Sequence, residues 1–428
     1  MNDGKCSSPA PVITAIAEAR PDGAKINRAV IQFDGEVPDP ATITVKDRTV
    51  LSAAAEGNQI ILQLSETDEA AEVFPQPPHF GEGPGGPGPG GPGGPNGPGP
   101  GGPNGPGPGG SEGSGSGPGG PNGPGQGGPH GSRGSDSPMR LVRPVQVTVT
   151  IPGYGEITST RAECPVIDDF VQNEYKGMPY NLFSPENREA QKMYPLVVFI
   201  PDASVNGPDA TAALVQGIGA TIWAEPEEQA KRPCYVLAIQ VPSRLPITGA
   251  GYTTTPQFDV VKEIIDKVIE ENPIDTKRVY ATGQSQGCMS MCEMNCRYPD
   301  LFAASLLVSG QWDPVRVGKL ADHRFFIGLS SGGMREFPGM NAITEELEKN
   351  GATIARISLN YRDGWDANNE KIRKAQGKAN VVYTVFDAAT IFPDDGKVRG
   401  QILHHNRGWE LTYQLESARE WIFSQKKD

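Results

Sequence analysis

Hydrophobic and polar positions divide the chain into two regions of different pattern. Residues 11–64 hold short runs in which apolar and polar residues alternate, and turn-forming Pro, Asp, Asn and Gly residues separate the runs. This alternation is typical of β-strands, and several such strands at close spacing predict a small β-sandwich. The predicted strands are Val12–Ala17, Ala29–Phe33, Thr42–Val45, Gln59–Leu64 and, further along the chain, Val145–Ile151.

From about Asp169 the pattern changes to apolar runs that alternate with helical segments. The apolar runs predict the buried strands Leu196–Ile200, Tyr235–Gln240, Arg278–Thr282, Ala304–Ser309, Phe325–Ser330, Ile354–Leu359 and Val381–Phe386. Apolar residues at helical spacing predict the helices Asp259–Glu271, Cys288–Tyr298, Asn341–Asn350 and Trp409–Gln425. This alternation predicts the α/β class, with a mostly parallel sheet and helices on both faces.

A tract rich in glycine and proline interrupts the first region. Residues 81–134 contain 28 Gly and 14 Pro, and the sequence GGPNGPGP occurs at 93–100 and again at 101–108. Such a segment has too little apolar surface to offset the entropy lost on ordering, so it predicts a flexible tether. The predicted organisation is a β-domain over residues 1–152, with the disordered insert at about 81–137, and an α/β domain over 153–428.

Composition and charge exclude several classes of partner. The net charge is −13 and no basic run interrupts the acidic surface, which argues against nucleic-acid binding. No apolar run approaches the roughly 18 residues of a membrane helix, so no membrane partner is expected. The first residues lack the pattern of a signal peptide, which predicts a cytoplasmic protein, or a secreted one if a leader has been removed.

The segment Gly283-Gln-Ser285-Gln-Gly287 carries the main chemical signal. A G-x-S-x-G sequence between a strand and a helix predicts a nucleophile elbow, in which a strained turn exposes the serine hydroxyl. The same spacing occurs around Ser111 and Ser330. Ser111 lies in the Gly/Pro tract, and no helix directly follows Ser330, so Ser285 is the predicted nucleophile.

A serine nucleophile needs a base, which is usually histidine. The chain has five histidines. His79 and His130 flank the Gly/Pro tract, and His323 precedes a strand, whereas sites on parallel sheets form at the carboxyl ends of strands. His404 and His405 follow the last predicted strand, and the order serine then histidine matches that of α/β-hydrolases.

Several segments resemble bacterial α/β-hydrolase esterases, which are often described as predicted peptidases. They are residues 194–203, 216–224, 229–237, 278–287, 297–303, 337–340 and 420–423. Some members of this family carry an immunoglobulin-like N-terminal domain, which the region before about residue 152 resembles. The resemblance implies an α/β-hydrolase fold preceded by a small Ig-like β-sandwich.

The resemblance also implies roles for single residues. In the family the histidine stands four residues before an aromatic residue, which selects His405 with Trp409 over His404. The oxyanion hole is expected to use the backbone N–H groups of Gln286, after the nucleophile, and of Ala203. Ala203 belongs to the sequence Pro-Asp-Ala-Ser, where relatives often have His-Gly-Ala-Gly.

The acid of the expected triad is less clearly marked. The family usually has Asp a few residues before the Pro-Gly-Met sequence, and that position corresponds to Gly333 here. Asp313, after the strand Ala304–Ser309, is therefore predicted as the acid, with Glu336 as the reserve candidate. Asp363 and Asp387 are weaker alternatives.

These features predict a serine carboxylic-ester hydrolase that acts through a covalent acyl-enzyme on a small-molecule ester, without cofactor or metal. Two alternatives stay open: a peptidase of the same fold, and a degenerate hydrolase that serves as a binding module. Cys288, Cys292 and Cys296 share one helical face. No second segment offers further metal ligands, so core packing is the favoured interpretation.

Overall fold

The computed structural model of the chain describes residues 9–75, 141–186, 188–249 and 251–428. The Gly/Pro tract with its repeats, Ser111, His79 and His130 lie outside the described residues. Among the helices that are described, none combines the length and the apolar character needed to cross a membrane.

The first described part, residues 9–75 and 141–163, is called the β-region here and contains two sheets. One sheet has the order β4-β5-β2-β1-β8 and the other β3-β6-β7. The strands are β1 Val12–Glu18, β2 Lys25–Gln32, β3 Thr44–Val45, β4 Val50–Glu56, β5 Gln59–Leu64, β6 Thr148–Ile151, β7 Gly155–Thr158 and β8 Arg161–Glu163. Ile31 and Leu62 of the first sheet and Val149 of the second belong to one buried core. The small β-domain is thus confirmed, whereas its immunoglobulin-like character stays a prediction.

The β-region differs from the sequence-based expectation at its end. Three strands, not one, follow the Gly/Pro tract, and β8 pairs in parallel with β1 through Thr14 and Arg161. The region therefore continues past the predicted boundary at residue 152. The described flanks of the tract meet, because the Arg143 N–H donates to the Val73 carbonyl over 2.7 Å.

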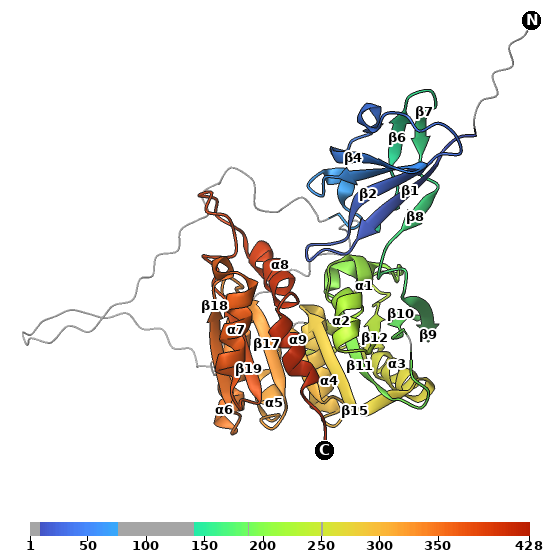
Figure 1. Cartoon of the computed structure of the whole chain (residues 1–428). Helices are drawn as coiled ribbons and strands as arrows, with labels where there is room; N and C mark the ends of the chain where they lie inside the picture. Colours follow the sequence, from blue (N-terminus) through green and yellow to red (C-terminus); the bar gives the residue numbers. More distant parts are fainter. Residues whose placement is uncertain (1–8, 76–140, 187, 250) are drawn as a thin grey trace, which may run out of the picture. The chain divides into compact units, whose positions relative to one another are not determined.

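The remaining residues, called the α/β region, are built on a nine-stranded sheet with the order β18-β19-β17-β16-β15-β11-β12-β10-β9 (Figure 1). The parallel strands are β11 Tyr194–Ile200, β12 Tyr235–Ile239, β15 Ile274–Gln284, β16 Ala304–Val308, β17 Phe325–Ser330, β18 Ile354–Leu359 and β19 Val381–Phe386. The strands β9 Val171–Tyr175 and β10 Met178–Phe183 form an antiparallel hairpin at one edge. A two-stranded ribbon adds β13 Thr248–Gly249 and β14 Thr253–Thr254. The predicted mostly parallel sheet is confirmed.

Helices cover both faces of this sheet (Figure 1). They are α1 Ala212–Val215, α2 Pro226–Lys231, α3 Gln257–Glu271, α4 Gln286–Arg297, α5 Pro314–Gly318, α6 Glu336–Lys349, α7 Trp365–Gln376, α8 Gln401–Thr412 and α9 Glu416–Phe423. In the central strand β11, Leu196 and Val198 join a buried core with α3, α4 and α6. Val197 and Phe199 point the other way and join a second core with α8 and α9. The period of two along a strand thus builds a core on each face.

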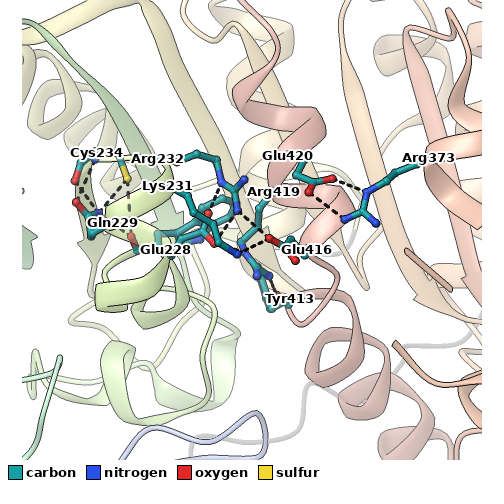
Figure 2. A network of polar contacts seen from close by, with 11 residues as sticks. Glu228, Gln229, Lys231, Arg232, Cys234, Arg373, Tyr413, Glu416, Arg419 and Glu420 are labelled. Atoms are coloured by element: carbon teal, nitrogen blue, oxygen red, sulfur yellow. Dashed lines mark hydrogen bonds and ion pairs between the residues drawn. The ribbon is translucent and has the colours of Figure 1, made fainter. Parts of the chain in front are cut away.

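The C-terminal part differs from the single predicted helix Trp409–Gln425. Two helices, α8 and α9, stand there, and α8 begins at Gln401, so His404 and His405 are helical residues and not loop residues. A buried ionic network fixes α9 to α2, as Figure 2 shows. The Arg419 guanidinium donates to the Glu228 carboxylate over 3.0 Å and to the Tyr413 carbonyl over 2.7 Å. Because the Glu228 charge is buried, its pairing with arginine offsets the cost of desolvation.

Candidate active site

Ser285 occupies a sharp turn between β15 and α4. Its backbone has φ 53° and ψ −112°, in the left-handed half of φ space that non-glycine residues rarely adopt. The flanking glycines are needed for steric reasons. A Cβ atom at Gly287 would lie 1.9 Å from the Ile200 carbonyl oxygen, and one at Gly283 would lie 2.6 Å from the Gly287 carbonyl carbon. The local structure therefore has the strand–turn–helix geometry that the motif predicts.

His405 lies between Ser285 and a carboxylate. Its Nε2 is 2.9 Å from Ser285 Oγ, and its Nδ1 is 2.9 Å from Glu336 Oε1. With Nδ1 protonated, the imidazole donates to the carboxylate and Nε2 accepts from the serine hydroxyl. This tautomer is assigned from the hydrogen-bond network. The three side chains thus form one continuous chain of hydrogen bonds.

Close helix packing sets the reach of His405. A Cβ atom at Gly408, on the same helix α8, would lie 2.4 Å from Ser309 Oγ, and one at Gly328 of β17 would lie 2.3 Å from Thr412 Cγ2. Only small residues allow α8 to approach β16 and β17 this closely. The Trp409 ring, expected beside the histidine, stands edge-on to the imidazole with 5.0 Å between ring centroids.

The structure corrects the prediction that Asp313 is the acid. Asp313 is the N-cap of α5, and its Oδ1 accepts hydrogen bonds from the Val315 and Arg316 N–H groups over 3.0 and 3.3 Å. The carboxylate on His405 is that of Glu336, the reserve candidate.

The local reason lies at Gly333, the position at which the family usually has Asp. A Cβ atom there would lie 2.1 Å from Glu336 Oε1. The Glu336 side chain therefore fills the space that a side chain at Gly333 would need.

Burial and hydrogen bonding act in opposite directions on Glu336. Burial raises the pKa of Glu336, but the hydrogen bond and charge of His405 lower it, as do backbone N–H groups of Glu336 and Arg335. The net effect holds the pKa of Glu336 below its usual value, so the group is a carboxylate at neutral pH. Its place at the first residue of α6 also suits a negative charge.

The competing candidates have other environments. His404 lies against Gly332, where a Cβ atom would be 2.3 Å from His404 Nδ1. Burial lowers the pKa of His404, and the Glu336 charge opposes this shift. Ser330 Oγ accepts from the Gly332 N–H over 3.1 Å, and His323 Nε2 lies 3.0 Å from a backbone carbonyl oxygen. None of these contacts resembles the chain of hydrogen bonds at Ser285.

Each residue expected in the oxyanion hole is the first residue of a helical segment near Ser285. Gln286 is the first residue of α4, and Ala203 is the first residue of a 3₁₀ turn, Ala203–Val205, in the loop after β11. Backbone N–H groups at such positions have no partner within the helix and can bind an anion. The close approach of the Ile200 carbonyl to Gly287 brings this loop beside the elbow.

Sequence reasoning missed two residues that hold the loop after β11. The Asn206 and Gln286 side chains exchange two amide hydrogen bonds, of 3.0 and 3.1 Å. Gln216 Nε2 donates to Asp202 Oδ1 over 2.9 Å, and Gln216 Oε1 accepts from Gln284 Nε2 over 3.0 Å. The glutamines on both sides of Ser285 in the motif were a signal, but the sequence does not show their partners.

The remaining candidates belong to the core. Cys288 and Cys292 are buried in the core between the sheet and α4, and Cys296 packs against it. Trp223 and Trp312 are fully buried, with the Trp312 indole donating to Glu293 over 2.9 Å. Among the described residues, no group of three or more His, Cys, Asp or Glu side chains is arranged to hold a metal ion.

No family model and no curated protein matches this sequence. Among solved structures, one described as a thermostable esterase covers 97% of this chain and 100% of its own, with 20% identity and a TM-score of 0.68. The chain has the α/β-hydrolase fold.

Two further structures match a smaller share of the chain. A mutant feruloyl esterase module from Clostridium thermocellum complexed with sinapinate covers 58% of this chain and 88% of its own, with 12% identity and a TM-score of 0.37. An S-formylglutathione hydrolase from Staphylococcus aureus covers 59% and 97%, with 13% identity and a TM-score of 0.33. The fold assignment rests on the first structure and on the order of strands in the nine-stranded sheet.

Proposed function

We propose that this protein is a serine carboxylic-ester hydrolase that acts through a covalent acyl-enzyme. The observation that carries the proposal is the unbroken chain of hydrogen bonds from Ser285 through His405 to Glu336, with the serine on a strained elbow. This arrangement has the relations of nucleophile, base and orienting acid that ester hydrolysis requires. The substrate in this proposal is a small-molecule ester.

In the first half of the reaction, Ser285 Oγ attacks the ester carbonyl carbon while His405 Nε2 takes its proton. The carbonyl oxygen becomes negative and is stabilised by the N–H groups of Gln286 and Ala203. Glu336 holds the imidazole orientation and stabilises the imidazolium. The tetrahedral intermediate then collapses, the ester C–O bond breaks, and His405 returns the proton to the leaving alcohol.

In the second half, a water molecule attacks the acyl-enzyme. His405 takes a proton from this water, the oxyanion forms again at the same N–H groups, and the proton passes to Ser285 Oγ as the acid product leaves. The balance is one ester and one water converted into one acid and one alcohol. No cofactor is required for these steps.

Different observations distinguish the proposed esterase from its two alternatives, the binding module and the peptidase. The binding-module hypothesis depended on a vacant acid position, and the Glu336 carboxylate on His405 removes that reason. A peptidase would use the same three residues on an amide. Hydrolysis of p-nitrophenyl esters without cleavage of matched p-nitroanilides supports the esterase, and the opposite preference supports the peptidase.

The decisive experiment compares Ser285→Ala with the matched control Ser330→Ala, because both serines have G-x-S-x-G spacing. Ser285→Ala is expected to abolish p-nitrophenyl butyrate hydrolysis and labelling by a fluorophosphonate probe. Ser330→Ala is expected to retain both. Labelling that persists in Ser285→Ala, or a wild-type protein that neither hydrolyses esters nor reacts with the probe, contradicts the proposal.

A further inference from the structure

We propose that the β-region is a positioning element for the oxyanion hole. In this proposal, its turn at residues 20–25 holds the segment 215–217 of the α/β region, and Gln216 transmits that position to the loop after β11. The inference rests on the proposed function, and it gives the N-terminal region a role in turnover.

The turn contacts the segment on both sides of Gln216. The Ala24 N–H donates to the Val215 carbonyl over 2.8 Å. On the other side, a Cβ atom at Gly217 would lie only 2.9 Å from the Pro21 carbonyl oxygen. Glycine at 217 therefore permits a close approach of two backbones, and the residue between these contacts has little freedom to move.

Gln216 in turn binds both neighbours of Ala203. Its Nε2 donates to Asp202 Oδ1 over 2.9 Å and to Ser204 Oγ over 3.0 Å, while its Oε1 accepts from the Asp202 N–H over 3.3 Å. The Ala203 N–H, the proposed oxyanion donor, lies between these two residues. One amide side chain, only 2% exposed, thus binds the residue on each side of the donor, Asp202 through its N–H and carboxylate and Ser204 through its hydroxyl.

The same amide reaches the elbow. Gln216 Oε1 also accepts from Gln284 Nε2 over 3.0 Å, and Gln284 directly precedes Ser285. The Asn206–Gln286 pair forms a second link between the loop and the elbow. The two proposed oxyanion donors, Gln286 and Ala203, are therefore held relative to each other by buried hydrogen bonds on both sides of Ser285.

The functional consequence follows from the geometry that an oxyanion requires. Donors stabilise the transition state only when they lie about 2.7–3.1 Å from the developing oxygen anion. Loss of their alignment raises the barrier of the chemical step and affects ground-state binding much less. Disturbing Gln216, or the turn that holds it, should therefore lower kcat while leaving KM nearly unchanged.

The test compares the buried Gln216 with Gln229, which is half-buried. Gln229 on α2 donates to the Trp223 and Cys234 carbonyls over 2.7 and 3.1 Å, so Gln229→Ala removes similar amide bonds away from the oxyanion loop. Gln216→Ala is expected to lower kcat for p-nitrophenyl butyrate by about 10–100-fold, less than the 10²–10³ typical of losing an oxyanion donor outright. Gln229→Ala is expected to lower Tm but keep kcat within about twofold.

Two variants test the contribution of the β-region. Gly217→Ala inserts a methyl group against the Pro21 carbonyl, and Pro21→Gly loosens the turn without adding a side chain. Both are expected to lower kcat by about 3–10-fold, with KM within about threefold, since they displace Gln216 without removing it. If Gly217→Ala does not fold, Pro21→Gly alone tests the contact. For Pro21→Gly we also expect faster hydrogen exchange of the backbone amides 202–206 than in the wild type.

Each result has one meaning. Wild-type kcat in Gln216→Ala, or an equal loss in Gln229→Ala, overturns the positioning role of Gln216. Reduced kcat in Gln216→Ala with wild-type kcat and exchange in Pro21→Gly overturns the role of the β-region. These outcomes require an active wild-type enzyme, so they differ from failure of the proposed function, in which the wild type neither turns over esters nor labels at Ser285.

Discussion

The two partners of His405 are held in place by different means. Ser285 is placed by the main chain, because its strained φ and the two small glycines beside it fix the elbow. Glu336 is placed by a side chain that reaches the imidazole from the first turn of α6. A backbone-defined position requires a fixed local sequence. A side-chain-defined position requires only that some carboxylate arrive at the same point in space.

The largest effect is expected at His405, which contacts both Ser285 and Glu336. His405→Ala removes the proposed base and should lower kcat/KM by about 10⁴-fold or more. His404→Ala, one residue away but lying against Gly332, should stay within about threefold. Steady-state ester hydrolysis by the two purified variants measures the difference. Equal losses in both would contradict the assignment of His405.

The next effect concerns the acid loop alone. Glu336→Gln should lower turnover by about 10³–10⁴-fold, because a neutral amide cannot stabilise the imidazolium. Asp313→Asn should change turnover by less than about threefold, since asparagine also caps a helix well. Kinetics on both variants, with Tm as a check on folding, decide between the carboxylates. Full activity of Glu336→Gln together with loss in Asp313→Asn would restore the sequence-based choice.

The elbow and the acid loop also differ in how far the sequence alone predicts them. The G-x-S-x-G motif predicts both the residue and its backbone conformation, because the glycines are local requirements. Glu336 could be given only as a reserve, because its contact with His405 joins residues 69 positions apart. Gln216 was missed for the same reason, since its partner Gln284 is 68 positions away.

Fold prediction shows the same division between local and distant information. The central strands follow from continuous apolar runs, so they could be predicted. The exposed strand β9 has no apolar run, and β8 is recognised only through its pairing with β1. The last helix was predicted to start at Trp409, directly after Gly408, and glycine is a poor helix former. In the structure α8 begins at Gln401 and includes Gly408, where close packing against Ser309 favours glycine.

A carboxylate exchange tests whether only the position of the charge matters. In Glu336→Ala the imidazole loses its carboxylate partner, and the space beside Gly333 becomes free. Adding Gly333→Asp to this variant should raise kcat by about 10–100-fold over Glu336→Ala, because a carboxylate then enters the vacated space. Ester-hydrolysis assays that measure kcat of the single and the double variant provide the comparison. No gain in the double variant would mean that Glu336 contributes more than a suitably placed charge.

A smaller effect concerns the pH dependence of stability. The pKa of Glu336 is held below its usual value, so its contribution to stability is present above the unfolded-state pKa and is lost as pH falls through the lower folded-state pKa. The stability difference between wild type and Glu336→Gln should therefore shrink on acidification. Ser285→Ala removes no titrating carboxylate, so its stability difference from wild type should stay nearly constant. Urea unfolding at pH 7 and at pH 4 measures both differences, and a constant gap for Glu336→Gln contradicts the assignment.

The smallest effect is expected from deleting residues 81–134, which supply neither partner of His405. The flanks of the tract are already joined by the hydrogen bond between Arg143 and Val73, so a shorter connection leaves both flanks in place. Closing a shorter loop costs less entropy, about 0.6 kcal/mol for each halving of its length, so stability should rise slightly. Ester kinetics should not change, because the deleted residues include none of the three residues proposed for catalysis. Thermal unfolding and kcat of the deletion variant test both statements. A lower Tm or a loss of turnover would show that the tract packs on the folded regions and contributes to the site.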